Sequence, residues 1–165
     1  HPDSPTHNHI EIVLSTKDMV HITHQQEYQQ EQPNHLQIGF VRMSPCQQYV
    51  SYTFSVDSEE NCYMARVKHI ATGKLVDQLD HVSVVNTEFS SDSEFLYYTV
   101  ADPLRRPFKV MKHRIGTNVE HDVQLFHEQN DAFFVDLHKT KDNVSHTTPI
   151  NLRAMLISPN PACFA

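Results

Sequence analysis

Residues 44–53 read SPCQQYVSYT and residues 90–99 read SSDSEFLYYT, so a polar turn followed by an alternating segment occurs twice, 46 residues apart. Apolar and polar side chains that alternate in this way are typical of a half-buried β-strand. A similar start recurs at residues 140–143, 50 residues after the second copy. The repeat predicts one supersecondary unit that the chain uses at least twice.

Each copy of the unit contains four segments with strand periodicity, and none shows a helical stripe. Gly73 and Gly116 each lie between two apolar runs, where a hairpin needs a positive φ. A further alternating segment contains Phe133, Val135 and Leu137. The expected strands of the two units span about 35–41, 48–56, 62–69 and 75–79, then about 83–89, 94–101, 108–115 and 122–127.

Four strands that recur every ~40 to 50 residues are typical of a β-propeller blade. The alternative is a single β-sandwich whose strands are evenly spaced, but the internal repeat favours the propeller. We therefore predict an all-β fold: a partial β-propeller with about two four-stranded antiparallel blades plus the start of a third. We expect a polar N-terminal segment at 1–34 with one strand near 10–14, blades at 35–143, and a divergent tail at 144–165.

Composition and charge exclude several function classes. The formal net charge is −7 and the 13 Lys and Arg are scattered, which argues against a nucleic-acid groove or an anionic membrane surface. No stretch approaches the roughly 18 consecutive apolar residues of a membrane span. Cys46, Cys62 and Cys163 are an odd and sparse set, which favours a reducing compartment and a cytoplasmic location.

Several side chains could be mistaken for reactive sites. The pairs His7/His9 and His21/His24 have short spacings, but no Cys or carboxylate set joins them, so we interpret them as solvated and predict neither a metal nor a cofactor site. His69, His113 and Cys46 are interpreted as hydrogen-bonded strand or turn residues. The densest basic cluster is interpreted as solvated strand faces and loops, and consists of Arg105, Arg106, Lys109, Lys112 and Arg114.

A long collinear match, over roughly residues 36–143, resembles the first propeller blades of the prolyl oligopeptidase family of serine peptidases, and most of all its oligopeptidase B branch. The similarity is sharpest at Arg106-Pro107, followed by a strand and then His113-Arg114-Ile115-Gly116-Thr117, where the family has a His-x-Leu-Gly-Thr hairpin. It also includes residues 40–45, 49–56, 65–74 and 95–99. The residues that match the family's structural motif are Arg106, Pro107, His113, Gly116 and Thr117. We expect Arg106 to pair with a carboxylate between blades. The Gln-rich segment 24–34 and the tail depart from the family.

The resemblance implies a role in peptide hydrolysis without catalytic residues in this segment. In the family a Ser-Asp-His triad on an α/β-hydrolase domain cleaves peptides, and the oligopeptidase B branch cleaves after Lys or Arg, while the propeller admits short peptides. The nucleophile lies on a Gly-x-Ser-x-Gly elbow, and none of the three glycines here, Gly39, Gly73 and Gly116, brackets a serine in that way. We expect no catalytic residue in the chain and no activity of the chain alone.

An alternative hypothesis is a protein-interaction module, made by truncation or splicing, that binds a partner through exposed blade faces. Two blades do not close a ring of about four to eight, so we expect uncovered faces and self-association, near residues 132–150 more than at the Gln-rich start. The side chains expected to pack between blades are Phe40, Tyr52, Phe54, Phe89, Tyr98, Phe126 and Phe133.

Overall fold

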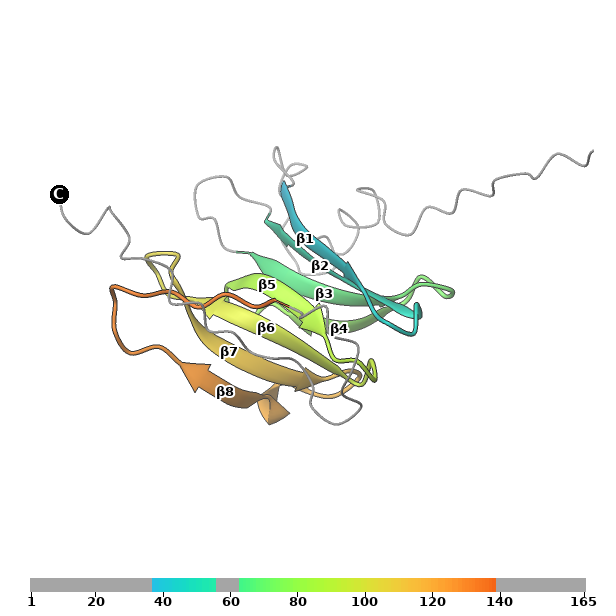
Figure 1. The fold of residues 1–165 in the computed structure, drawn as a ribbon. Coiled ribbons are helices and arrows are strands. Elements are labelled where there is room, and N and C mark those ends of the chain that lie inside the picture. Colours follow the sequence, from blue (N-terminus) through green and yellow to red (C-terminus); the bar gives the residue numbers. More distant parts are fainter. Residues whose placement is uncertain (1–36, 56–62, 139–165) are drawn as a thin grey trace, which may run out of the picture. The chain divides into compact units, whose positions relative to one another are not determined.

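The computed structural model describes residues 37–55 and 63–138. These residues form two four-stranded antiparallel sheets, each with its strands in chain order (Figure 1). The first sheet consists of β1 (Gln37–Met43), β2 (Tyr49–Ser55), β3 (Met64–His69) and β4 (Leu75–Leu79). The second consists of β5 (Val84–Phe89), β6 (Phe95–Ala101), β7 (Pro107–Arg114) and β8 (Val123–His127). The predicted all-β fold with two consecutive blades is confirmed.

Helical structure within the described residues is limited to a single 3₁₀ turn, η1 (Val119–His121), between β7 and β8. The eight expected strands all form, with ends that differ by at most a few residues. The expected strand near 10–14 and the tail at 144–165 lie outside the described residues.

The repeated turns have the same hydrogen bonds in both sheets, which explains why their sequences match. The Ser44 N–H donates to the Tyr49 carbonyl at 2.9 Å, and the Ser90 N–H donates to the Phe95 carbonyl at 2.9 Å. The serine hydroxyls accept from the Tyr49 and Phe95 N–H groups at 3.0 and 2.9 Å. Serine is suited to this position because its short side chain satisfies a backbone donor in the turn.

Positive φ angles occur at the turns. Gly73 and Gly116 have φ of 66° and 79°, as the hairpin prediction required. The repeat-equivalent Gln47 and Ser93 have φ of 59° and 63°, and Arg105 has 67°. Non-glycine residues adopt this region at some energetic cost, so the surrounding hydrogen bonds hold them there.

The core lies between the two sheets. It combines β3 and β4 of the first sheet with β5 and β6 of the second, and its buried members are Ala65, Val67, Leu79, Val84, Phe89, Leu96, Tyr98 and Val100. Polar contacts surround this cluster. The Ser51 and Thr87 hydroxyls lie 3.0 Å apart and are buried, and the Arg42 Nε donates to Glu88 Oε1 at 2.8 Å. The two sheets therefore meet through a packed interface.

The segment after β8 differs from its prediction. Val135 and Leu137 are buried and join Tyr97 and Val110 in a second cluster on the other side of β6 and β7. Residues 133–138 nevertheless form no strand. Among the described residues, one backbone N–H of this segment donates to the sheet, that of Val135 to the Pro107 carbonyl at 2.8 Å. A ladder needs a regular series of such bonds.

Burial also corrects part of the expected set of packing residues. Tyr52, Phe54, Phe89 and Tyr98 are at most 2% exposed, as expected. The remaining three are not fully buried: Phe40 is 40% exposed, Phe126 is 36% exposed, and Phe133 is intermediate. Phe40 lies on β1 and Phe126 on β8, and each of these strands has a neighbour in its sheet on one side only.

Candidate functional site

His113 lies on β7 at the interface between the two sheets and is fully buried. Its Nδ1 donates to Asp122 Oδ1 at 2.7 Å, and its Nε2 lies 3.5 Å from Oδ1 of Asp77 on β4 of the first sheet. At 3.5 Å the second contact is an ion pair rather than a well-formed hydrogen bond. The imidazole therefore lies between one carboxylate from each sheet.

Both carboxylates are nearly inaccessible and have further donors. The Gly116 N–H donates to both oxygens of Asp77 at 3.0 Å, and the Tyr98 hydroxyl donates to Asp122 Oδ2 at 2.7 Å. The side chains of Asp77 and Asp122 are only 4% and 3% exposed. We call His113, Asp77, Asp122 and Tyr98 the His113 cluster.

The protonation of this cluster follows from its surroundings. Burial by itself lowers the pKa of His113, but the carboxylates of Asp77 and Asp122 outweigh it and raise the pKa above the ordinary value of 6.5. Burial and the bond to Asp122 raise the pKa of Tyr98, so its hydroxyl stays a donor. The cluster thus favours an imidazolium between two carboxylates.

Sequence reasoning did not identify Asp77 or Asp122 as partners of His113. A signal for Asp77 was present, because it lies two residues from both Leu75 and Leu79 in a short strand. Residues two apart share a face of a strand, so a carboxylate there points towards the side that the apolar residues bury. A charge on such a face needs a partner.

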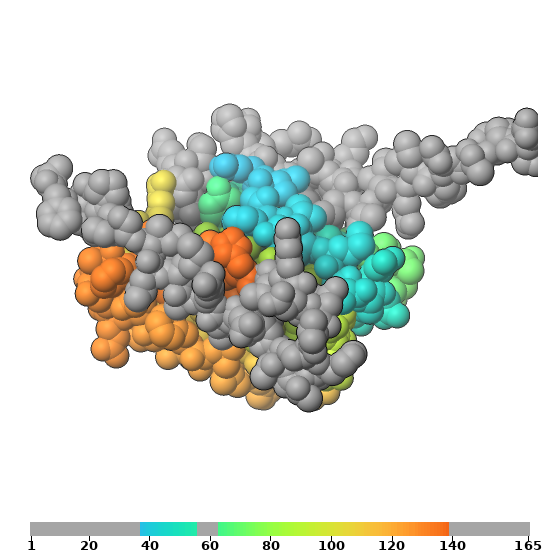
Figure 2. Space-filling model, viewed as in Figure 1, coloured from blue at the N-terminus to red at the C-terminus, as the bar shows by residue number. Residues whose placement is uncertain are grey.

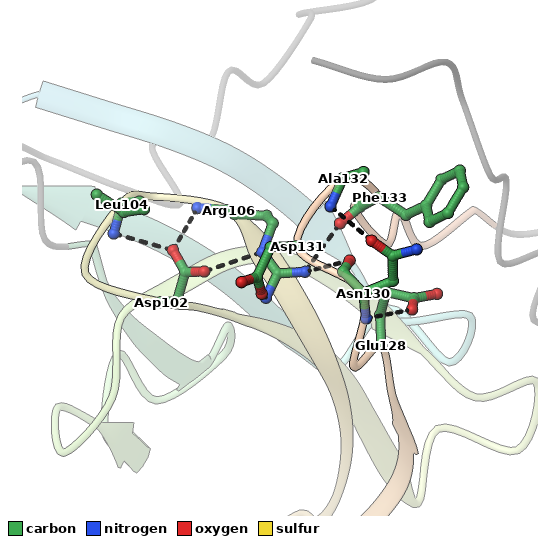
Figure 3. Close-up of polar contacts among 8 residues, drawn as sticks. All are labelled: Asp102, Leu104, Arg106, Glu128, Asn130, Asp131, Ala132 and Phe133. Atoms are coloured by element: carbon green, nitrogen blue, oxygen red, sulfur yellow. Dashed lines mark hydrogen bonds and ion pairs between the residues drawn. The ribbon is translucent and has the colours of Figure 1, made fainter. Parts of the chain in front are cut away.

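Arg106 lies at the other end of β7, where Figure 3 shows its guanidinium bonded to two segments. Its Nε donates to Asp102 Oδ2 at 2.9 Å, and its other nitrogens donate to the carbonyls of Asn130 and Phe133 and to Asp131 Oδ1 at 2.9 to 3.0 Å. Arg106 thus joins the loop before β7 to the segment after β8. Its described carboxylate partners are Asp102 in the loop before β7 and Asp131 in the segment after β8.

The loop around Arg106 is itself ordered by Asp102. Asp102 Oδ1 accepts from the backbone N–H groups of Leu104 and Arg106, each at 2.9 Å. Burial alone raises the pKa of Asp102, but the bonds and the charge of Arg106 outweigh it, and the pKa is lowered. Glu128 and Asn130 accept from the N–H groups two residues after them, which shapes the segment that Arg106 holds.

The motif residues therefore gather in two places rather than one. Arg106 immediately precedes β7, and Pro107 is the first residue of that strand, where its carbonyl accepts from the Val135 N–H. His113 lies near the end of β7, and Gly116 and Thr117 form the turn after it, where the Thr117 hydroxyl donates to the Arg114 carbonyl at 2.7 Å. The first group holds the chain that leaves the second sheet, and the second group contacts the first sheet.

Cys46 and His69 have local partners. The Cys46 sulfur lies 3.3 Å from the Ser44 hydroxyl, and its backbone N–H donates to the Ser93 hydroxyl at 3.1 Å. Burial raises the pKa of the Cys46 thiol, but hydrogen bonds outweigh it and lower the pKa. His69 Nδ1 contacts Thr72, and its ring packs edge-on against Tyr49.

The basic residues near β7 have different surroundings. The Lys109 ammonium lies 4.9 Å from the centroid of Phe108 and the Lys112 ammonium 3.7 Å from that of Phe95, whereas Arg106 is largely buried and Arg114 is exposed.

Within residues 37–55 and 63–138, no group of three or more His, Cys, Asp or Glu has the arrangement of a metal site. In the same residues no helix is long and apolar enough to cross a membrane. The histidine pairs His7/His9 and His21/His24 lie outside the described residues.

Exposed apolar side chains occur mainly on two strands. On β1 they are Ile38, Phe40, Val41 and Met43, which are 40% to 56% exposed, and in Figure 2 the blue atoms of β1 lie at the visible surface. On β8 they are Val123, Leu125 and Phe126. In the described part of the face expected at 132–150, Phe133 and Phe134 are half-buried and Val135 and Leu137 are buried.

The comparisons with known proteins agree on one family. Residues 31–145 match the family described as prolyl oligopeptidase, N-terminal beta-propeller domain. Protease 2 of Moraxella lacunata is 26% identical over 113 residues, which cover 67% of this chain and 16% of that protein.

Two solved structures have a similar fold. The structure of oligopeptidase B from Leishmania major matches with a TM-score of 0.66 and 18% identity, over 84% of this chain and 18% of that one. Oligopeptidase B from Trypanosoma brucei, with covalently bound antipain in its closed form, matches with a TM-score of 0.61 and 19% identity, over 79% and 16%. The chain thus spans less than a fifth of the length of each of these three proteins.

Proposed function

The chain belongs to the prolyl oligopeptidase family, as part of its N-terminal β-propeller domain, and on this premise we propose that its two blades help to gate the access of short peptides to a hydrolase domain. The observation that supports this role most directly is the pair of docked four-stranded sheets, because a gate must exclude folded proteins by its shape.

We propose that the chemistry belongs to residues beyond this segment. The relatives are several times longer than the chain, and the chain contains no Gly-x-Ser-x-Gly elbow for a serine nucleophile. In the proposed whole enzyme, peptides would be cleaved after Lys or Arg, as the resemblance to the oligopeptidase B branch implies. A cytoplasmic location is proposed on the odd, sparse cysteines, of which Cys46 is free.

A graft into a relative tests the gating role. Residues 37–138 would replace the matching segment of the Moraxella lacunata protease, and hydrolysis of a short basic peptide and of a long denatured protein would be compared with the parent enzyme. We expect the graft to retain a preference for the short substrate. A graft that folds and cleaves both substrates equally well would contradict the gating role of these blades.

The catalytic part of the proposal has a simpler test. The purified 165-residue chain should release no product from a basic peptide or an activated ester. A burst of product that a serine-directed phosphonate blocks would show a nucleophile in the chain itself.

We also propose that the isolated chain self-associates, with β1 as the contact surface. The exposed apolar side chains of β1 support this location. The face near 132–150 that the sequence suggested stays a second candidate, and its residues 139–150 lie outside the described residues.

A further inference from the structure

Among the described residues, the two sheets are joined by several neutral contacts and by two charged ones, the Arg42–Glu88 pair and the His113 cluster, of which the His113 cluster is the more deeply buried. The core between the sheets is apolar, and Ser51 pairs with Thr87 as two hydroxyls. The Arg42–Glu88 pair is partly open to water, with the Arg42 side chain 32% exposed. Only for the buried cluster does the charge state of the contact strongly affect its free energy, because water does not screen it.

We propose that the His113 cluster is a proton-controlled clamp between the first and second blades: with the imidazole protonated the blades are held together, and loss of its proton weakens their docking. The clamp is independent of the proposed gating role, since it concerns the contact between the blades and not the substrate.

The proposed clamp depends on the charge balance of the cluster. Asp77 from β4 and Asp122 from the residue before β8 face the imidazole from opposite sides, and they are the charged groups that act on it among the described residues. Tyr98 from β6 and the Gly116 N–H add neutral donors to the carboxylates. With His113 protonated, one positive charge lies between two negative charges. Without that proton, two buried carboxylates remain, and among residues 37–55 and 63–138 no other cation is seen to act on this site.

Deprotonation of His113 weakens the contact between the two sheets more than the contact within the second sheet. A neutral imidazole keeps its Nδ1–H bond to Asp122, which belongs to the same sheet as His113. Its Nε2 then presents a lone pair to Asp77 Oδ1, 3.5 Å away in the other sheet. Two acceptors that face each other repel, so deprotonation weakens the bridge to the first sheet while the contact within the second sheet survives.

The direction of the pH effect follows from linkage. Because the pKa of His113 is raised in the folded state, the stabilisation is fully present below the ordinary histidine pKa of 6.5 and is lost as the pH rises through the folded value. One proton is involved, so the folding equilibrium constant should fall by at most about tenfold per pH unit in that interval.

Urea unfolding of the 165-residue chain between about pH 6 and pH 8.5 tests the clamp. The wild type should lose stability with rising pH, whereas His113→Gln, which keeps a polar side chain but cannot take up the proton, should be weaker at pH 6 and lack most of the slope. His69→Gln is the matched control, because His69 lies on β3 and contacts Thr72 and Tyr49 instead. Equal slopes for wild type and His113→Gln would overturn the proposal.

A second measurement uses the wild type alone and so does not depend on a variant that folds. NMR would follow the His113 ring through its titration and, in the same samples, the hydrogen-exchange protection of the Gly116 amide, corrected for the intrinsic effect of pH. That amide reports the inter-sheet contact, because it donates to Asp77. Protection should fall in step with deprotonation of the ring. Protection that stays constant through the titration would show that the blades do not respond to this proton.

Discussion

β1 and β5 hold the same position in their sheets, yet their burial is opposite. Six of the seven residues of β1 are exposed, although Ile38, Phe40, Val41 and Met43 are apolar. Four of the six residues of β5 are buried, and they include the polar Asn86 and Thr87. Apolar content therefore does not decide which of the two strands is buried.

The neighbours of each strand explain the difference. β5 packs against β1 and β2 of the first sheet, with Thr87 against Ser51. On its other side Asn86 Nδ2 donates to the Leu137 carbonyl at 2.8 Å. β1 packs mainly against β2 in its own sheet and against β5. A strand of this fold is buried when a sheet or segment lies on each side of it, and its polar residues are then satisfied by those neighbours.

The largest expected effect on the free energy of unfolding distinguishes Phe89 of β5 from Phe40 of β1. Phe89→Ala should lower the free energy of unfolding by about 3 to 5 kcal/mol, because it empties a site in the core between the sheets. Phe40→Ala should lower it by less than about 1 kcal/mol, since Phe40 is 40% exposed. Chemical denaturation at one fixed pH measures both. Equal losses would show that β1 is as well packed as β5.

The next effect concerns the segment that follows β8. Arg106→Lys keeps the charge but loses the planar fork that contacts Asp102, Asp131 and two carbonyls. We expect the free energy of unfolding to fall by about 1.5 to 3 kcal/mol. Limited proteolysis near residues 128–133 should become faster, which mass spectrometry of the fragments would measure. Arg114→Lys is the matched control, since Arg114 is exposed. Unchanged cleavage in Arg106→Lys would contradict the role of Arg106 in holding the segment after β8 against the loop before β7.

A smaller loss of stability is expected at the buried hydroxyl pair of Ser51 and Thr87, which joins β2 to β5. Thr87→Val leaves the buried Ser51 hydroxyl without this partner and should cost about 1 to 3 kcal/mol. The double variant with Ser51→Ala should recover part of that loss, because both polar groups are then removed. Urea unfolding of the four proteins of this cycle gives the coupling. Strictly additive losses would mean that the two hydroxyls do not depend on each other.

The smallest effect on stability is expected at the surface of β1. Val41→Ser and Met43→Ser should change the free energy of unfolding by only about 0.5 kcal/mol each, but should reduce concentration-dependent association in sedimentation. Leu104→Ser is the control, because Leu104 is 88% exposed but lies in the loop before β7. A wild-type chain that stays monomeric at high concentration would remove the basis for association through β1.

The sequence predicted the eight strands because local patterns report local structure. Alternation in residues 49–55 and 95–101, and glycine at positions 73 and 116, depend on neighbours a few residues away. The repeated serine turn was visible for the same reason. The segment with Phe133, Val135 and Leu137 shows the limit, because its alternation reflects packing on the second sheet without a strand ladder.

By itself the sequence determined the strand order, the two units and the family to which they belong, since these follow from patterns along the chain and from a long collinear match. Only the tertiary structure decided which faces are covered and which charges meet. His113 and Asp77 are 36 residues apart in different sheets, and no local pattern encodes the distance between them. That distance is set when the sheets dock, because docking removes both groups from water and places the imidazole of one sheet beside the carboxylate of the other.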